Sequence, residues 1–161
     1  MGDTALEDLD PLALENQVCF ALAVAARTVI SVYRPLLEPM NLTHPQYLVM
    51  LALWQDAPLS VTELSRRLEL DPGTLSPLLK RLEAAGYLTR ERDPGDERSL
   101  AVRLTPAGVA LRAQAEQIPP AIVERLGMDM AELMELHQSL TRVIGAAQTA
   151  VARSAAETSA G

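Results

Sequence analysis

Residues 60–105 read SVTELSRRLELDPGTLSPLLKRLEAAGYLTRERDPGDERSLAVRLT and carry the strongest structural signals of the chain. Ser60-Val61-Thr62-Glu63 has the form of a capping box, which predicts a short helix that ends at Leu68. Asp71-Pro72 then provides an N-cap and a first helical residue for a second helix, and Gly86 is a typical residue to end it. The segment therefore begins with two helices that are joined by a tight turn.

The spacing of apolar residues changes to two from Tyr87 to Asp93 and from Arg98 to Thr105, which is typical of β-strands. Asp93-Pro94-Gly95-Asp96 lies between these stretches and favours a tight turn. A two-stranded hairpin is therefore expected, and it is the only β-structure that we expect. Two helices with a tight turn, followed by a hairpin, have the order of a winged helix-turn-helix.

Helices are expected on both sides of this segment, because apolar residues recur there at spacings of three and four. A first long helix is predicted over residues 14–37, and Thr43-His44-Pro45-Gln46 opens another as a capping box with proline just inside its start. A helix that begins at Thr105-Pro106 should end at Pro119-Pro120, and a last helix should cover about residues 129–151. The predicted fold class is mainly α with a small β-hairpin wing.

The chain is expected to form a single domain over residues 14–153, with a flexible tail at residues 1–13 and a disordered tail at residues 154–161. Within this domain, residues 45–105 are expected to form the winged helix-turn-helix. The helices on either side of it cover residues 14–44 and 106–153.

The composition is that of a folded soluble protein: of 161 residues, 48% are apolar and 22% are charged. No uninterrupted apolar run approaches the roughly 18 residues of a membrane-spanning helix. The acidic N-terminus lacks the features of a signal peptide, so we expect a cytoplasmic protein without a membrane partner. A single cysteine excludes an intrachain disulfide and a multi-cysteine metal site, and neither a cofactor nor a metal is predicted.

The net charge of -7 at first disfavours a nucleic-acid partner, because DNA affinity comes largely from Lys and Arg. Residues 60–105 contain eight of the 14 basic and eight of the 21 acidic residues, so the whole of the -7 lies outside them. A neutral segment can present a basic face if its acidic side chains point elsewhere. The net charge therefore does not exclude DNA.

In a winged helix-turn-helix the second helix enters the major groove, and the hairpin tip reaches the adjacent minor groove. Thr74 and Ser76 can hydrogen-bond to base edges there, and Lys80 and Arg81 are suited to phosphates. Arg98 is suited to the minor groove, with Asp96 able to orient its guanidinium group. Helix pairs with a hairpin also occur in proteins that bind only proteins, so the element order alone leaves both partners open. The candidate DNA-binding residues are Pro72, Gly73, Thr74, Ser76, Pro77, Lys80, Arg81, Arg90, Asp96 and Arg98.

Several motifs resemble a known family. The recognition helix and wing of MarR-type transcriptional regulators are similar to Leu75–Glu83, Gly86–Arg90, Asp96–Arg98 and Leu104–Gly108. The organic-hydroperoxide sensor branch of that family, the OhrR repressors, resembles this chain at Leu14–Leu22, Tyr33–Leu37 and Pro45–Leu48. The resemblance spans about residues 14–151. It implies a homodimer built from the N- and C-terminal helices, which binds a pseudo-palindromic double-stranded operator as a repressor. It also implies release from DNA when an organic hydroperoxide oxidises the N-terminal cysteine.

Cys19 alone, in an Ala- and Leu-rich helix, would be interpreted as a small buried apolar residue. The resemblance instead makes it the peroxide-sensing residue, and its place near the start of the first helix favours an anion. Tyr33 follows by 14 residues, on nearly the same face but about 21 Å along the axis of a straight helix. If Tyr33 donates a hydrogen bond to the thiolate, as the resemblance implies, it must come from the partner subunit.

His44 departs from the resembled branch, which commonly has a second tyrosine at this position. A histidine can also donate to a thiolate, and a protonated histidine would stabilise the thiolate further. The alternative is an exposed residue in the first turn of a helix. His137 lies on an apolar stripe and is expected to pack in the core.

A second cysteine, which forms an intersubunit disulfide in some members of the branch, is missing here. Oxidised Cys19 would therefore form a mixed disulfide with a small cellular thiol or be overoxidised to the sulfinic or sulfonic acid.

Three other functions remain open at this stage. The nearest is a MarR-type repressor that a small aromatic or phenolic ligand releases from DNA, with Cys19 in a structural role. A thiol peroxidase would use Cys19 catalytically, but the chain has no Cys-x-x-Cys and no resolving cysteine, so no enzyme activity is predicted. A helical adaptor would have no salt-dependent affinity for duplex DNA.

Overall fold

A computed structural model describes residues 10–159 of the chain, apart from the side chains of Asp96 and Glu97. The chain forms two compact units, one up to Ile118 and one from Pro119 onward. Of the tails expected from the sequence, residues 1–9 and 160–161 lie outside the described residues. The division of the chain into dimerisation and DNA-binding parts remains a prediction.

The first unit starts with the 3-10 helix η1 (Leu14–Asn16), the helix α1 (Val18–Leu37) and the 3-10 helix η2 (Glu38–Met40). The predicted helix over residues 14–37 is therefore interrupted at Gln17, whose backbone is extended, with φ -82° and ψ 117°. Because of this interruption, α1 begins at Val18 and not at Leu14.

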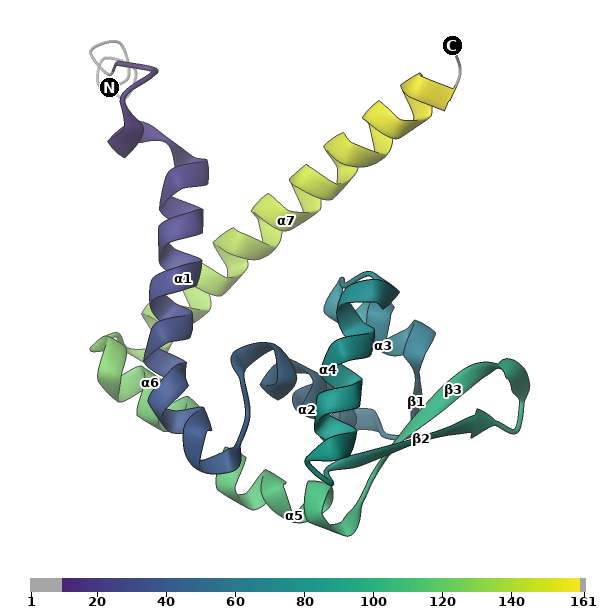
Figure 1. Cartoon of the computed structure of the whole chain (residues 1–161). Helices are drawn as coiled ribbons and strands as arrows, with labels where there is room; N and C mark the ends of the chain where they lie inside the picture. The colour runs from purple at the N-terminus through teal and green to yellow at the C-terminus, as the bar shows by residue number, and fades with distance from the viewer. Residues whose placement is uncertain (1–9, 160–161) are drawn as a thin grey trace. The chain divides into compact units, whose positions relative to one another are not determined.

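The winged part continues the first unit, and in Figure 1 its β-hairpin extends from the C-terminal end of α4. The predicted fold class, mainly α with a small β wing in a winged helix-turn-helix, is confirmed. Its elements are α2 (His44–Asp56), β1 (Leu59–Ser60), α3 (Val61–Leu68), α4 (Pro72–Ala84), β2 (Leu88–Asp93), β3 (Asp96–Leu104) and α5 (Pro106–Ala115).

Side-chain caps define where the helices of the winged part begin. Ser60 Oγ accepts a hydrogen bond from Glu63 N at 3.0 Å, and Asp71 Oδ1 accepts one from Thr74 N at 2.9 Å. Each cap satisfies one of the backbone N–H groups that a helix start leaves without a partner. The four helix starts that the sequence predicted in this part, at Thr43, Ser60, Asp71 and Thr105, are confirmed.

The end of α4 is set by Gly86, whose φ of +82° lies in the left-handed region that favours glycine. Gly86 N donates to Glu83 O and Tyr87 N donates to Leu82 O, both at 3.0 Å. This pair of bonds is a Schellman motif, which turns the chain sharply from the helix into β2.

The sheet has three strands in the order β1-β3-β2, all antiparallel. The sequence predicted a two-stranded hairpin, but the sheet has a third strand, β1. Its residues Leu59 and Ser60 pair with Val102 and Ala101. A strand of two residues is too short to show an alternating pattern in the sequence.

The core of the first unit lies beneath α4. Leu75, Leu79 and Leu82 share one face of this helix and are at most 1% exposed, while Pro77 lies on the exposed side. Pro77 lies within α4, which runs without a break from Pro72 to Ala84. The other fully buried large side chains are Leu37, Met40, Val49, Met50, Leu53, Leu64, Leu88 and Val102.

The base of the wing is closely packed against α5. Thr105 N donates to Tyr87 O at 3.1 Å, which joins the end of the hairpin to its beginning. A Cβ atom on Gly108 would lie 2.0 Å from Tyr87 O, so the backbones approach more closely here than any other residue allows. Trp54 Nε1 donates to Gly108 O at 2.8 Å and holds α2 against the same point.

The second unit consists of α6 (Ile118–Leu126), whose first residue closes the first unit, and α7 (Met130–Ser159). The predicted end of a helix at Pro119-Pro120 is wrong: α5 ends at Ala115, and the two prolines lie in the first turn of α6, where no N–H is needed. The chain also remains helical beyond Arg153, where we expected disorder. No residue of α7 is buried, and His137, expected in the core, is exposed.

The stretch Val18–Met40 is long enough and apolar enough, by length and composition, to cross a membrane, with a hydropathy of 1.4. This corrects the expectation that no segment approaches a spanning helix. That expectation counted uninterrupted apolar residues, whereas the mean hydropathy of the segment stays high although it contains Arg27 and Arg34. One such helix is weak evidence for a membrane span, because a helix of a soluble protein passes the same test.

Candidate functional site

The exposed face of α4 carries the side chains that the sequence predicted for DNA binding. Thr74, Ser76, Lys80 and Arg81 are all exposed, as are Pro72, Gly73 and Pro77. Because Leu75, Leu79 and Leu82 hold the opposite face against the core, this surface is rigidly presented. Small residues lie in the first turns of α4 and basic residues after them, as the predicted contact with DNA requires, and we call α4 the reading helix.

Asp71 fixes the conformation of Thr74 at the start of α4. Its carboxylate accepts hydrogen bonds from Thr74 N at 2.9 Å and from Thr74 Oγ1 at 2.7 Å. The hydroxyl of Thr74, together with its backbone N–H, holds the pKa of Asp71 below its usual range. Since its proton is used in this bond, Thr74 presents lone pairs to an approaching group, which suits a donor on a base edge.

Arg90 is placed differently from the other predicted DNA-binding residues. Its guanidinium donates to Glu83 Oε2 from Nε at 3.1 Å and from Nη2 at 2.7 Å, and its backbone N donates to Glu83 Oε1. These bonds connect α4 to β2 across the turn at Gly86, and the Arg90 side chain lowers the pKa of Glu83. Arg90 thus orients the wing relative to the reading helix, a role that we did not predict.

The wing turns at Pro94-Gly95, where Gly95 N donates to Asp93 Oδ1 at 2.9 Å. Arg98 lies on β3 near this turn and is exposed. The side chain of Asp96 lies outside the described part of the chain, so its orientation of Arg98 stays a prediction. The position of Arg98 is that expected of a residue that reaches into a minor groove.

Cys19 is the second residue of α1, and its side chain is exposed. Because α1 begins at Val18 and not at Leu14, Cys19 lies closer to the start of its helix than the sequence predicted. The first N–H groups of a helix have no partner within it and favour an anion such as a thiolate. Tyr33 lies on the same helix about 21 Å away, so the two side chains of one chain do not meet.

Tyr33, His44 and Tyr47 form an aromatic cluster at the other end of α1. The rings of Tyr33 and His44 meet edge to face with centroids 5.0 Å apart, and Tyr47 lies 6.1 Å from Tyr33 and 6.5 Å from His44. The left-handed residue Asn41 reverses the chain between α1 and α2 and so brings these residues together. The sequence analysis did not identify Tyr47 as a site residue, although Tyr47 follows His44 by three residues on one helix face.

His44 is half-buried in this cluster, and its burial lowers the pKa of the imidazole. The ring is therefore neutral at pH 7, in contrast to the protonated histidine that we considered as a stabiliser of the thiolate. Burial also raises the pKa of Tyr33, as it does for Tyr47, where Tyr33 adds to the effect. All three side chains thus remain neutral, and each has a polar N–H or O–H group.

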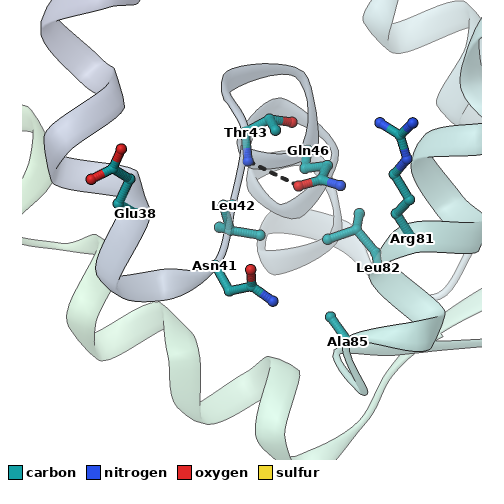
Figure 2. Close-up of a pocket in the computed structure, with 8 residues that line it drawn as sticks. All are labelled: Glu38, Asn41, Leu42, Thr43, Gln46, Arg81, Leu82 and Ala85. Carbon is teal, nitrogen blue, oxygen red and sulfur yellow. Dashed lines mark hydrogen bonds between the residues drawn. The ribbon is translucent and has the colours of Figure 1, made fainter.

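A cleft of about 390 Å³ separates η2 and the start of α2 from α4 (Figure 2). Leu42 and Leu82 form its inner wall, and Thr43 N donates to Gln46 Oε1 at 2.9 Å at its edge. Arg81 and Ala85 lie on the α4 side, and Glu38 and Asn41 on the other. The cleft therefore lies between the segment that follows α1 and the helix α4.

Two proteins of similar sequence are transcriptional regulators. The profile of the MarR family matches residues 42–100. The organic hydroperoxide resistance transcriptional regulator of Bacillus subtilis is 42% identical over 77% of this chain and 86% of its own length. The regulator TtmR of Methylorubrum extorquens is 45% identical over 81% of this chain and 67% of its own length.

Solved structures agree with this assignment. The overoxidized AbfR bound to DNA is 35% identical, with a TM-score of 0.64 over 81% of this chain and 95% of that protein. The winged helix-turn-helix, the exposed reading helix α4 and these similarities lead to one conclusion. The chain belongs to the MarR family and is a DNA-binding transcriptional regulator.

Proposed function

We propose that the protein is a cytoplasmic homodimeric repressor that senses organic hydroperoxides through Cys19 and then releases its operator. The observation that carries the proposal is the arrangement of α1, with an exposed thiol at one end and the cluster of Tyr33, His44 and Tyr47 at the other. A second copy, placed antiparallel by a twofold axis, would bring each thiol to the partner's cluster.

The apolar surface of α1 supports a dimer. Val18 is 67% exposed and Phe20 is 39% exposed, and Leu37 alone is buried among the residues of α1. Helix α7 also has exposed apolar residues along its length. Contiguous exposed apolar surface of this kind marks a protein interface.

The sensing chemistry needs only the thiol, the oxidant and a proton donor. The Cys19 thiolate forms a bond to one hydroperoxide oxygen, the O–O bond breaks, and the alkoxide leaves and takes up a proton as an alcohol. A neutral His44 or Tyr33 of the partner would hydrogen-bond to the sulfur and the new oxygen. A small cellular thiol would then attack the sulfenic sulfur and release water, which leaves a mixed disulfide.

The mixed disulfide is the oxidised form that we expect to release DNA. In one related structure, overoxidized AbfR is bound to DNA, so overoxidation does not prevent binding in that protein. A mixed disulfide adds bulk to the interface and would change the spacing of the two reading helices. That spacing must match half-sites about 34 Å apart.

The proposal is tested by titrating the protein with the duplex upstream of its own gene. The reduced protein, the protein treated with one equivalent of an organic hydroperoxide and a small thiol, and the Cys19→Ser variant are compared. We expect tight binding that only the oxidised wild type loses, by about a hundredfold. A wild type that binds equally well before and after oxidation would contradict peroxide sensing.

A MarR-type repressor that a small aromatic or phenolic ligand releases is the second candidate. It is supported by the cleft of Figure 2, which has Leu42 and Leu82 on its inner wall and the guanidinium group of Arg81 at its edge. In that case the Cys19→Ser variant should respond to the ligand like the wild type, and peroxide should have no effect on either.

A further inference from the structure

The segment that precedes α1 is a short, compact turn that is held by hydrogen bonds among its own residues and Gln17. Asp10 Oδ1 accepts a hydrogen bond from Leu12 N at 2.9 Å, and Asn16 Nδ2 donates to Asp10 O at 3.1 Å. Gln17 Nε2 donates to Pro11 O at 2.7 Å and to Ala13 O at 3.2 Å. We refer to residues 10–16 as the arm. Its apolar tip, Leu12, is 88% exposed, the largest exposed fraction among the exposed large apolar side chains of the described residues.

Twofold symmetry predicts where the arm lies in the proposed dimer, and this step rests on the proposed function. If Cys19 meets the partner's Tyr33, the twofold axis passes near Ala26, midway between them. Each residue of α1 then faces the partner residue at an equal distance on the other side of Ala26. Val18, at the start of α1, therefore faces Arg34 of the partner subunit, and the arm that precedes Val18 lies toward residues 38–40 of the partner subunit, which follow the end of its α1.

Residues 38–40 form η2, which borders the cleft of Figure 2. We propose that the arm of each subunit docks in this cleft of the other subunit, with Leu12 against the wall formed by Leu42 and Leu82. The volume of about 390 Å³ is sufficient for a leucine side chain and part of the adjacent backbone.

The charges near the cleft favour this occupant. The arm carries the carboxylates of Asp10 and Glu15, and Arg81 lines the receiving cleft. Glu38 has the same sign as the arm, but it lies across the cleft from Arg81 in Figure 2. Exposed pairs of this kind orient a contact more than they stabilise it.

The docked arm would connect the thiol directly to the reading helix of the other subunit. The last residue of the arm is three positions from Cys19, and the cleft includes Arg81, a predicted phosphate contact on α4. A change at Cys19 that displaces the start of α1 would therefore withdraw Leu12 from the partner's α4. This gives the sensor a route to the DNA-binding surface that bypasses the rest of α1.

Crosslinking tests the proposal in the full chain with Cys19→Ser, so that only introduced thiols react. One variant carries Leu12→Cys with Ala85→Cys, in the cleft, and a control carries Leu12→Cys with Thr62→Cys, an exposed position on α3. Each is treated with a short bifunctional maleimide, and its mass in solution is measured by sedimentation. We expect a covalent dimer from the Ala85→Cys variant and little from the control.

Two other results would overturn the proposal and can be told apart. A dimer by sedimentation without selective crosslinking would leave the cleft open, as a ligand-released repressor requires, and the proposed dimer would stand. A monomer at every concentration would contradict the arm and the proposed dimeric sensor together. Independently, Leu12→Asp should raise the dissociation constant of the dimer at least about tenfold and Leu12→Met should not, so equal constants would contradict the docking.

Discussion

The winged part and helix α1 both contain many apolar residues but bury them differently. Around α4 the leucines are enclosed by their own chain, with Leu79 only 1% exposed, whereas Val18 at the start of α1 is 67% exposed. The leucines of α4 are therefore covered within the first unit of one chain. Helix α1 has an apolar surface that its own first unit does not cover, so its stability depends on what covers that surface.

The comparison predicts that Leu79→Ala has the largest effect on folding. Removing a fully buried leucine side chain should lower the free energy of unfolding by about 2–5 kcal/mol, because it leaves a cavity. Chemical denaturation of the variant measures this loss. Leu51→Ala, on the exposed side of α2, is the control and should cost much less; equal losses would mean that α4 is not part of a tight core.

Val18→Asp should act on association instead. If α1 lies in a symmetric interface, each dimer loses two buried valines, and the dissociation constant of the dimer should increase about a hundredfold. Sedimentation at a series of concentrations measures it, and circular dichroism should show that the helices remain. An unchanged dissociation constant would place Val18 outside any interface.

Arg98→Ala should weaken binding to the operator by about 1–3 kcal/mol if Arg98 contacts base edges at the wing. Arg81→Gln should instead reduce affinity for all duplexes and lower the salt dependence by about one counterion. Fluorescence anisotropy at several salt concentrations distinguishes the two effects. Arg125→Gln on α6 is the control, and no loss with Arg98→Ala would remove the wing from the interface.

The pH dependence of His44 is the smallest expected effect. Burial lowers the pKa of His44 in the folded chain below the ordinary value of 6.5, so between these two values the unfolded chain binds the extra proton. The stability contributed by the neutral ring is complete above pH 6.5 and is lost as the pH falls through the folded pKa. His44→Gln should show a flatter decline of thermal stability between pH 7 and pH 5, and parallel curves would show that His44 does not contribute.

Local signals allowed much of the fold to be predicted from the sequence. The helix starts at Thr43, Ser60 and Asp71 depend on side chains within three residues of the caps, and the Gly86 end depends on one glycine. Features set by distant contacts were missed. Strand β1 exists because Leu59 pairs with Val102, and prolines that can begin a helix as well as end one concealed α6.

The candidate site shows the same division. The exposed reading surface of α4 follows from a local helical pattern, so its residues could be identified from the sequence. The contact of Tyr33 with His44 depends on the chain reversal at Asn41, and the neutral state of His44 depends on its burial. Likewise, the turn between α4 and β2 places Arg90 beside Glu83, and the residue type of Arg90 alone does not predict this ion pair.

The close approach of Gly108 to Tyr87 has a mechanical consequence for regulation. With the two ends of the hairpin tied together and α5 seated against the backbone of Tyr87, the wing has no pivot at its root. Its angle to the reading helix is fixed further by the bonds between Arg90 and Glu83. In the proposed dimer, a signal would therefore change the separation and tilt of two rigid DNA-binding units and not the shape of either one, and the operator would detect it as a misfit in the phase of its half-sites.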